Sequence, residues 1–373
     1  MSALPSPGPA FLRNGRALQK NAGLLVGAGL AATAAVVAIT GRRWRAAEDP
    51  CTGHALDIDA ADTFKVERPD GTVLDGVVIG PDNGPPGGMG GVPPTSAAGA
   101  ATGMVVLSHC WTGSRATWEP VAARLVAAGR RVVLYDQRGH GASTMGPEDP
   151  TVEQLGDDLA AVLEAVDARD AVLAGHSMGG MAIQALAVAR PDVVAERVSA
   201  LVLAGTAGFG VTAGPLSGAA RFVTGNRSVE RLMAGRLGPA LTRGTVGRRP
   251  RQAHLEATRD AYLSLPTDVR RQFLIALQAM DFRAGLTSVA VPTTVVMGSR
   301  DLLTPPRLGR ALAAVIPGAH LVEVPGAGHM LPYEEPDRLA ELILSAPGGT
   351  GGVPPTTAAG AATERVRPEG GPS

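Results

Sequence analysis

Short runs of β-branched and aliphatic residues alternate with helical segments between about residues 63 and 345, and this alternation constrains the fold most strongly. The later runs are apolar at nearly every position, which is typical of strands that helices cover on both faces. The expected strands are Thr63–Glu67, Thr72–Ile79, Met104–Ser108, Arg131–Asp136, Ala171–His176, Val198–Ala204, Thr293–Met297 and His320–Val324. The expected helices are Trp118–Ala128, Thr151–Ala165, Met178–Ala189, Asp268–Phe282, Pro306–Val315 and Pro336–Leu344. The pattern predicts an α/β domain with a mostly parallel, eight-stranded sheet and helices on both faces.

The first two expected strands are connected by Pro69, Asp70 and Gly71, which are residues that favour a tight turn. So short a connection joins antiparallel strands, because parallel neighbours need a long crossover. We therefore expect these two strands to form a hairpin at one edge of the sheet.

The charge and cysteine content exclude several classes of function. Among 373 residues, 34 Lys and Arg balance 34 Asp and Glu, so no overall positive field is available to attract nucleic acid. Cys51 and Cys110 are too few for a disulfide framework or a cysteine zinc site, although a single bridge between them stays open. The H-E-x-x-H, C-x-x-C and phosphate-loop motifs are also lacking. We expect no nucleic-acid partner, no metal and no cofactor, and the oligomeric state stays open.

Residues 21–41 form an uncharged stretch within an N-terminal region that spans residues 1–62. As a helix the stretch would be about 31 Å long, enough to cross the hydrocarbon core of a bilayer, although its many Ala and Gly residues make it only weakly apolar. Three interpretations stand: an uncleaved membrane anchor followed by a tether, a cleaved signal peptide of a secreted protein, and an Ala-rich helix that is soluble or lies on a surface. The basic residues that follow directly, Arg42, Arg43 and Arg45, favour the anchor.

Gly and Pro concentrate in two tracts, residues 80–103 and residues 346–373, and neither composition can bury a core. Nearly the same segment occurs in both, as GGVPPTSAAGAAT from Gly90 and as GGVPPTTAAGAAT from Gly351. We expect the first tract to be an insertion within a domain of residues 63–345 and the second to be a disordered tail. The repeat is interpreted as two similar flexible segments, with a shared docking motif as the alternative.

Gly175-His176-Ser177-Met178-Gly179 lies where an apolar strand passes directly into a helix. A serine on such a sharp turn adopts a strained backbone conformation, and the positions two before and two after it must be small because the strand and helix backbones nearly touch. Gly175 and Gly179 meet this need. The turn would place Ser177 at the carboxyl edge of the sheet as a nucleophile, with the Met178 amide directed at a developing oxyanion.

A serine nucleophile needs a base, and the base needs a carboxylate that orients it. Asp301 and His329 each follow an expected strand, so both are expected at the same edge of the sheet as the serine. Asp301 could instead only cap the helix that begins near Pro305, and His320 is a rival base that would face away from this edge. We predict that Ser177, His329 and Asp301 form a catalytic triad.

The order Ser, Asp, His is that of the α/β-hydrolase superfamily, which the chain resembles from about residue 63 to residue 345, in its esterase and monoacylglycerol-lipase-like branch. Two further segments carry the resemblance, Ser108-His109-Cys110-Trp111-Thr112-Gly113 and Asp136-Gln137-Arg138-Gly139-His140-Gly141-Ala142-Ser143. The first is similar to the His-Gly oxyanion motif of that branch. The resemblance implies that the Trp111 amide is the second oxyanion donor, beside that of Met178.

Cys110 departs from this motif, because the family usually has glycine there. If the position needs a positive φ, a side chain adds strain of about 1 kcal/mol, and the turn is altered or the site is looser. A small buried apolar role for Cys110 is favoured over a redox or nucleophilic role.

The resemblance also implies a helical cap over the active site, inserted after the sixth strand at about residues 207–266. Residues 221–260 hold nine arginines against Glu230, Glu256 and Asp260, a local excess of positive charge in a neutral protein. Such a face is usually only solvated. The alternative is a cap that lies on anionic lipid headgroups.

These features predict a serine hydrolase that cleaves carboxylic esters, including lipid-derived esters such as monoacylglycerols, through an acyl-enzyme. Serine as the nucleophile disfavours the epoxide hydrolases and dehalogenases of the superfamily, which use a carboxylate. Two alternatives stay open: a cofactor-free haloperoxidase or perhydrolase on the same triad, and a non-catalytic binding protein. The expected ligand is a small-molecule or lipid ester, and the expected location is a membrane to which residues 21–41 anchor the chain.

Overall fold

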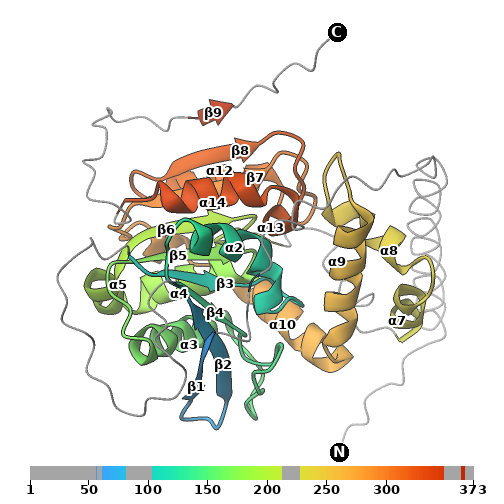
Figure 1. Ribbon diagram of the computed structural model, residues 1–373, viewed down its shortest axis with the longest axis horizontal. Coiled ribbons are helices and arrows are strands. Elements are labelled where there is room, and N and C mark those ends of the chain that lie inside the picture. Colours follow the sequence, from blue (N-terminus) through green and yellow to red (C-terminus); the bar gives the residue numbers. More distant parts are fainter. Residues whose placement is uncertain (1–55, 57–60, 81–102, 212–226, 348–362, 366–373) are drawn as a thin grey trace, which may run out of the picture. The chain divides into compact units, whose positions relative to one another are not determined.

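The computed structural model describes residues 56, 61–80, 103–211, 227–347 and 363–365 of the chain (Figure 1). Its strands form one sheet in the order β1-β2-β4-β3-β5-β6-β7-β8-β9. The strands are β1 (Asp62–Glu67), β2 (Val73–Ile79), β3 (Val105–Ser108), β4 (Val132–Tyr135), β5 (Ala171–His176), β6 (Val198–Ala204), β7 (Thr293–Gly298), β8 (His320–Val324) and β9 (Thr363–Arg365). The eight predicted strands correspond to β1–β8, so the predicted α/β sheet is confirmed.

The strand directions place several loops at one edge of the sheet. The β1–β2 and β2–β4 pairs are antiparallel, and every other neighbouring pair is parallel. The β1–β2 pair is the predicted hairpin, and Gly71 in its turn has a φ of +84°, which glycine adopts without strain. Because parallel strands end at the same edge, the loops after β3, β5, β7 and β8 gather there.

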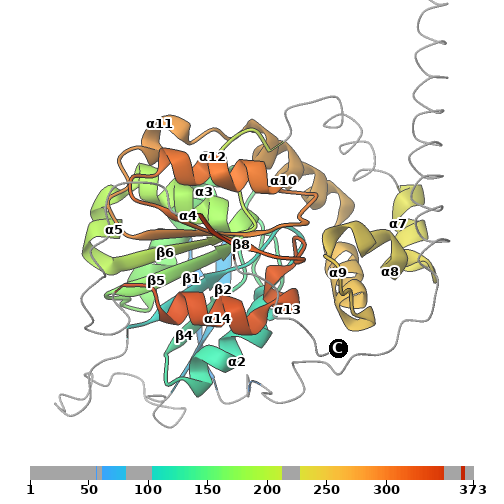
Figure 2. The same cartoon turned by 90° about the horizontal axis from the view of Figure 1, so that it is seen from above.

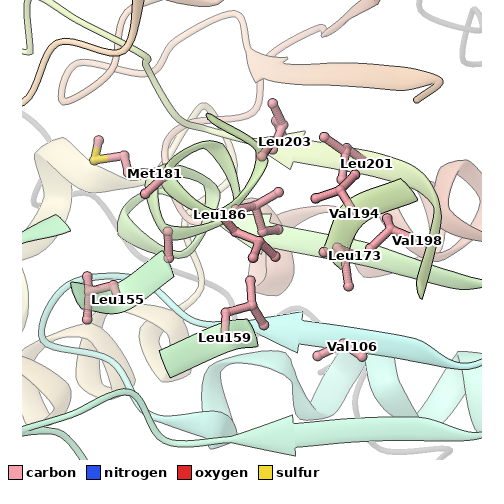
Figure 3. Packing of buried hydrophobic residues seen from close by; sticks show 14 of the residues in the cluster. Val106, Leu155, Leu159, Leu173, Met181, Leu186, Val194, Val198, Leu201 and Leu203 are labelled. Atoms are coloured by element: carbon pink, nitrogen blue, oxygen red, sulfur yellow. The ribbon is translucent and has the colours of Figure 1, made fainter. Parts of the chain in front are cut away.

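Helices cover both faces of the sheet, as the continuously apolar strands predicted (Figure 2). Successive strand residues point to opposite faces: Val106 and Leu173 belong to one buried cluster, and Val105 and Val172 belong to another. Figure 3 shows part of the first cluster. The helices on its side are α3 (Val152–Ala165), α4 (Met178–Ala189), α5 (Pro191–Arg197), α10 (Thr267–Ala279), α11 (Arg283–Leu286) and α12 (Pro306–Val315). The helices on the other side are α2 (Glu119–Ala127) and α14 (Pro336–Leu344).

The chain between β6 and β7 contains the insertion predicted as a cap. Its described elements are α7 (Arg227–Ala234), α8 (Gly238–Leu241), the 3₁₀ turn η2 (Thr242–Thr245) and α9 (Gln252–Ser264). Helices α7, α8 and α9 pack on one another and lie beside α10 and the short helix α13 (Leu331–Glu334) (Figures 1 and 2). Because α13 follows β8, the cap meets the sheet domain at the carboxyl edge of the strands.

Some predicted features lie outside the described residues: the apolar segment 21–41 and the interior of the Gly/Pro tract 80–103. No helix in the described part of the chain is long and apolar enough to cross a bilayer. The C-terminal tail contributes β9, which was not predicted and which pairs in parallel with β8 from Leu321–Thr363 to Glu323–Arg365. Without β9, β8 would be an edge strand with unpaired backbone N–H and C=O groups. A short segment can pair with such groups whatever side chains it carries.

Candidate active site

Ser177 lies on the turn between β5 and α4, at the carboxyl edge of the sheet. Its backbone has φ 54° and ψ −114°, a conformation that costs a non-glycine residue about 1–3 kcal/mol and persists only where the surroundings hold it. The Ser177 amide donates to the Ala204 carbonyl at 2.9 Å, and the Ser177 carbonyl accepts from Thr206 Oγ1 at 2.7 Å. These two bonds tie the strained residue to the end of β6.

The glycines around Ser177 lie where strand and helix backbones touch. A Cβ on Gly175 would lie 2.5 Å from the Gly179 carbonyl carbon. A Cβ on Gly179 would lie 2.0 Å from the Ser108 carbonyl oxygen. Only a hydrogen atom fits at both positions, as the sequence predicted, and the second contact holds the first turn of α4 against the end of β3.

Asp301 and His329 form a hydrogen-bonded pair at the ends of β7 and β8. Asp301 Oδ2 lies 2.8 Å from His329 Nδ1, and because a carboxylate can only accept, Nδ1 carries the proton and Nε2 is left as the basic nitrogen. Burial on its own raises the pKa of Asp301, but the electrostatic interaction with His329 and hydrogen bonds from His329 and Thr304 outweigh it, so the pKa lies below its usual value. The Asp301 carboxylate is therefore ionised at neutral pH.

Asp301 also fixes the turn that leads toward α12, but it does not cap this helix, whose N-cap residue is Pro305 and has no side-chain cap hydrogen bond. Its Oδ1 accepts from the amides of Leu303 and Thr304, each at 2.8 Å. The Thr304 hydroxyl lies 2.7 Å from Asp301 Oδ2 and 2.8 Å from the Gly205 carbonyl oxygen. One carboxylate oxygen thus holds the loop, and the other faces His329.

His329 lies beside the turn that carries Ser177. The His329 carbonyl oxygen lies 2.7 Å from Nε2 of His176, the residue before the serine, and the two rings are 5.0 Å apart. Burial, with a further contribution from His329, lowers the pKa of His176 to about 3, so this ring is neutral and donates from Nε2. The rival base His320 begins β8 at the opposite edge of the sheet. The fold thus places the Asp301–His329 pair beside the turn that carries Ser177 and leaves His320 apart from it.

Trp111 lies in the loop after β3, and Met178 is the first residue of α4. Parallel pairing places Ser108 opposite Gly175, so this loop and the serine turn leave the sheet side by side. The two predicted amide donors therefore lie on the segments that flank Ser177. An oxyanion hole requires such an arrangement.

The positive φ that would strain Cys110 occurs two residues further along the chain. Cys110 is not among the residues with a positive φ, whereas Thr112 has a φ of 62°. The condition under which Cys110 would add strain is therefore not met. Burial raises the pKa of the Cys110 thiol to about 11, so the thiol stays protonated, as the predicted packing role requires.

Two buried histidines hold the backbone on either side of Trp111. His109 Nδ1 donates to the Cys110 carbonyl at 2.8 Å, and His140 Nε2 accepts from the Thr112 amide at 3.3 Å. The other nitrogen of each ring bonds to the backbone of the turn after β4. Burial lowers the pKa of His109 to about 4 and that of His140 to about 3, so both rings are neutral at physiological pH. The turn after β4 thus supports the loop after β3, which carries Trp111.

An apolar cluster joins the loop after β3, the cap and the segment after β8. Its buried members are Cys110, Val246, Leu255 and Met330, with Tyr333 packed against them. Val246 and Leu255 belong to the cap, and Met330 directly follows His329. The cap therefore places apolar side chains next to the histidine of the predicted triad.

The positive charge of the cap is partly neutralised and partly exposed. Arg259 pairs with Asp260, and the half-buried Arg243 donates to the Val246 carbonyl. On and just after α7, Leu232 and Leu237 are 38% and 58% exposed. Among the described residues of the cap, the exposed arginines are Arg227, Arg231, Arg236, Arg248 and Arg249. The outer part of the cap thus mixes cationic and apolar side chains.

A family model described as the alpha/beta hydrolase family matches residues 105–342, which is more than half of the chain. The chain belongs to this family. No group of three or more His, Cys, Asp or Glu in the described part of the hydrolase is arranged to hold a metal ion.

The hydrolase is similar to mouse sn-1-specific diacylglycerol lipase ABHD11, with 28% identity over 253 residues that cover 65% of this chain and 80% of the relative. It is also 28% identical over 245 residues to BpoC of Mycobacterium tuberculosis, a candidate non-heme bromoperoxidase, with coverage of 62% and 88%. Among solved structures, the enol-lactonase from Burkholderia xenovorans LB400 matches with a TM-score of 0.58 and 26% identity, covering 74% of this chain and 96% of that one. The predicted family and fold are confirmed.

Sequence reasoning did not identify two supporting residues of the hydrolase site, Thr304 and His140. Thr304 lies three positions after Asp301, a spacing typical of turns in which an aspartate side chain bonds the backbone, and that spacing was an available signal. His140 acts on Thr112 across 28 positions of the sequence, so no local pattern could have indicated its role.

Proposed function

We propose that this protein is a serine hydrolase that cleaves carboxylic esters through Ser177, His329 and Asp301. The observation that carries the proposal is the Asp301–His329 hydrogen bond of 2.8 Å beside the strained turn of Ser177. The names of two similar proteins, a diacylglycerol lipase and an enol-lactonase, describe enzymes that act on ester bonds. Both support the ester as the substrate class.

Each group of the proposed triad has one task in the reaction. Ser177 Oγ attacks the ester carbonyl carbon while His329 Nε2 takes its proton, and the same nitrogen then returns the proton to the leaving alcohol. Ionised Asp301 accepts from Nδ1–H and stabilises the imidazolium. The Trp111 and Met178 amides donate to the oxyanion of the tetrahedral intermediate. Water, activated by His329, then releases the acid from the acyl-enzyme.

The test is covalent labelling by a fluorophosphonate probe, which reacts only with an activated serine. We expect the wild-type protein to take up one probe on Ser177, and Ser177→Ala and His329→Ala to take up none. Ser199→Ala is the matched control, because this serine lies in β6 and donates to the Asp170 carbonyl, away from the site. Hydrolysis of a panel of p-nitrophenyl esters should fall by about 10³-fold or more in both site variants. Labelling that survives in Ser177→Ala would contradict the assignment.

A second candidate is cofactor-free perhydrolase or haloperoxidase activity, which the similarity to BpoC favours. In this reaction hydrogen peroxide replaces water in attacking the acyl-enzyme, and the product is a peracid. Peracid formation from a carboxylic ester and peroxide, compared with ester hydrolysis at the same ester concentration, separates the two. The non-catalytic alternative is disfavoured, because it depended on a damaged turn at Cys110 and this residue has no positive φ.

Among carboxylic esters, we propose lipid-derived esters as the substrates. Exposed Leu232 and Leu237 alternate with exposed Arg231 and Arg236 on the cap, and such a mixture suits a surface with anionic headgroups and apolar chains. The proposed location is a membrane, to which residues 21–41 would anchor the chain; secretion after cleavage of a signal peptide is the alternative. Retention in the membrane fraction of cells after a high-salt wash, and its loss when residues 1–47 are removed, test the anchor.

A further inference from the structure

A segment of the cap is hydrogen-bonded to the loop that carries His329. The cap segment, residues 245–248, lies against the histidine loop, residues 326–330. The His329 amide donates to the Thr245 carbonyl at 2.8 Å, and the Arg248 amide donates to a carbonyl of the histidine loop at 2.8 Å. The backbone of the proposed base is therefore bonded directly to the cap.

The Glu334 side chain lies at this junction and accepts three backbone N–H groups. Its Oε2 accepts from Gly247 at 2.6 Å and from Gly328 at 2.9 Å, and its Oε1 accepts from Met330 at 3.1 Å. Gly328 and Met330 are the two neighbours of His329 in the sequence. One carboxylate thus bonds both sides of the histidine and the cap segment at the same time.

The backbones of the cap segment and the histidine loop are so close at Gly247 that no side chain fits between them. A Cβ on Gly247 would lie 2.0 Å from the Gly326 carbonyl oxygen and 2.6 Å from the Gly328 nitrogen. Burial raises the pKa of Glu334, while the three N–H groups act to lower it. A carboxylate is therefore costly to hold here, but it supplies acceptor oxygens to three donors. The side chain of glutamine has only one acceptor oxygen and would turn an NH₂ group toward at least one of them.

We propose that Glu334 is a positioning residue, which sets the place of His329 by tying the histidine loop to the docked cap segment. The inference rests on the proposed function, because it takes His329 as the base. It goes beyond that function by making catalysis depend on the cap being docked, so the cap acts on the position of the base as well as on the substrate. Glu334 itself touches neither Asp301 nor the nucleophile in this arrangement.

The experiment compares Glu334→Gln with Glu335→Gln in the full chain. Glu335 is the matched control, because it is the next residue, burial also raises its pKa, and it makes none of the three bonds. For p-nitrophenyl acetate we expect Glu334→Gln to lower kcat by about 10- to 100-fold, since small displacements of a catalytic group have effects of this size. KM should change by less than about threefold, because the substrate-binding surface is left in place.

Hydrogen–deuterium exchange reports the contact itself. Glu334→Gln should speed amide exchange in peptides that cover residues 245–248 and 326–330 and leave peptides from α3 and β5 unchanged. Glu334→Asp keeps both acceptor oxygens on a shorter side chain, so it should show a smaller change in the same direction in both exchange and kcat. It also serves as the test variant if the glutamine variant does not fold.

Three results would overturn the proposal: faster exchange with a wild-type kcat, a lower kcat without faster exchange in both segments, and equal losses in Glu334→Gln and Glu335→Gln. The first would show a purely structural bond. The proposed function fails separately, by activity that survives in Ser177→Ala, and the exchange comparison then still decides whether Glu334 joins the two segments.

Discussion

Gly179 lies against Ser108 so closely that a Cβ on the glycine would be 2.0 Å from the serine carbonyl oxygen. The contact joins the first turn of α4 to the end of β3. Because the two predicted amide donors lie on these two segments, the contact sets the distance between them. A single missing side chain thus supports the geometry of the site.

Gly179→Ala should separate the two segments and damage both stability and activity. Overpacking of this kind costs about 1–3 kcal/mol, so the melting temperature should fall by at least a few degrees. Ester hydrolysis by the folded fraction should fall at least about 10-fold, because the amide donors move apart. Gly244→Ala is the control, since its Cβ would meet no atom within 4 Å. Wild-type turnover in Gly179→Ala would contradict this account.

Thr304→Val should lower kcat through the loss of one hydroxyl. That hydroxyl lies 2.7 Å from Asp301 Oδ2, and a hydrogen bond to a charged group contributes about 1.5–3 kcal/mol. Part of this loss should appear in the chemical step as a decrease of kcat by about 10-fold, with KM little changed. Thr304→Ser keeps the hydroxyl and should keep most of the activity. Equal losses in the two variants would mean that the methyl packing, not the hydroxyl, is the cause.

The buried histidines make the free energy of unfolding depend on pH. Burial lowers the pKa values of His109, His140 and His176 from 6.5 to about 4, 3 and 3, so the folded state excludes protons that the unfolded state binds. Their stabilising effect is complete above pH 6.5 and is lost as pH falls below it, by at most about 1.4 kcal/mol per pH unit for each histidine. Denaturant unfolding between pH 7.5 and pH 5 measures how steeply the free energy of unfolding changes with pH. His140→Gln should show a weaker pH dependence than the wild-type protein. A stability that does not change over this interval would show that these rings can bind protons in the folded state.

The exposed cap surface should bind anionic vesicles weakly. A chain that begins at Glu48 lacks the segment 21–41, so any binding must come from the rest of the protein. We expect co-sedimentation with phosphatidylglycerol vesicles at low salt and release at about 0.5 M salt, because exposed charges are screened. The triple variant Arg231→Gln, Arg236→Gln and Leu237→Gln should lose the binding.

The control for the vesicle experiment is the double variant Arg169→Gln and Arg190→Gln, which removes the same number of charges at the other edge of the sheet. If this variant loses as much binding as the cap variant, the attraction comes from net charge and not from the cap. If the shortened chain ignores the vesicles even at low salt, the basic cap is only a solvated face.

The strands and the main helices were predictable because each depends on a local pattern. The continuously apolar runs marked β5 and β6 to the residue, and the glycines flanking Ser177 marked the turn between β5 and α4. Helix α5 was missed because it is short and directly follows α4, where Pro191 suggested only an end. Strand β9 was missed because the composition of the tail carries no strand pattern and its pairing depends on the backbone of β8.

The predicted strand ends were enough to locate the three residues of the predicted triad, but they did not indicate which residues support them. Thr304 was within reach of local reasoning. His140 acts on a backbone group 28 positions away, and Glu334 joins two amides close to it in the sequence to that of Gly247, 87 positions away. The φ of Cys110 was also beyond prediction, because the resemblance gave the family's usual residue and not the backbone conformation at this position. Supporting contacts of this kind become visible only when the loops of different strands are seen together.

The bonding of residues 245–248 to the histidine loop limits how this enzyme could be re-engineered. Grafting a foreign lid in place of helices α7 to α9 is an obvious route to a new substrate range. A graft that also replaced Gly247 would put a side chain where only 2.0 Å is available and so push away the backbone amide that donates to Glu334. The splice points for such a chimera therefore belong before Thr245 and after Arg248, so that these four residues stay with the catalytic domain.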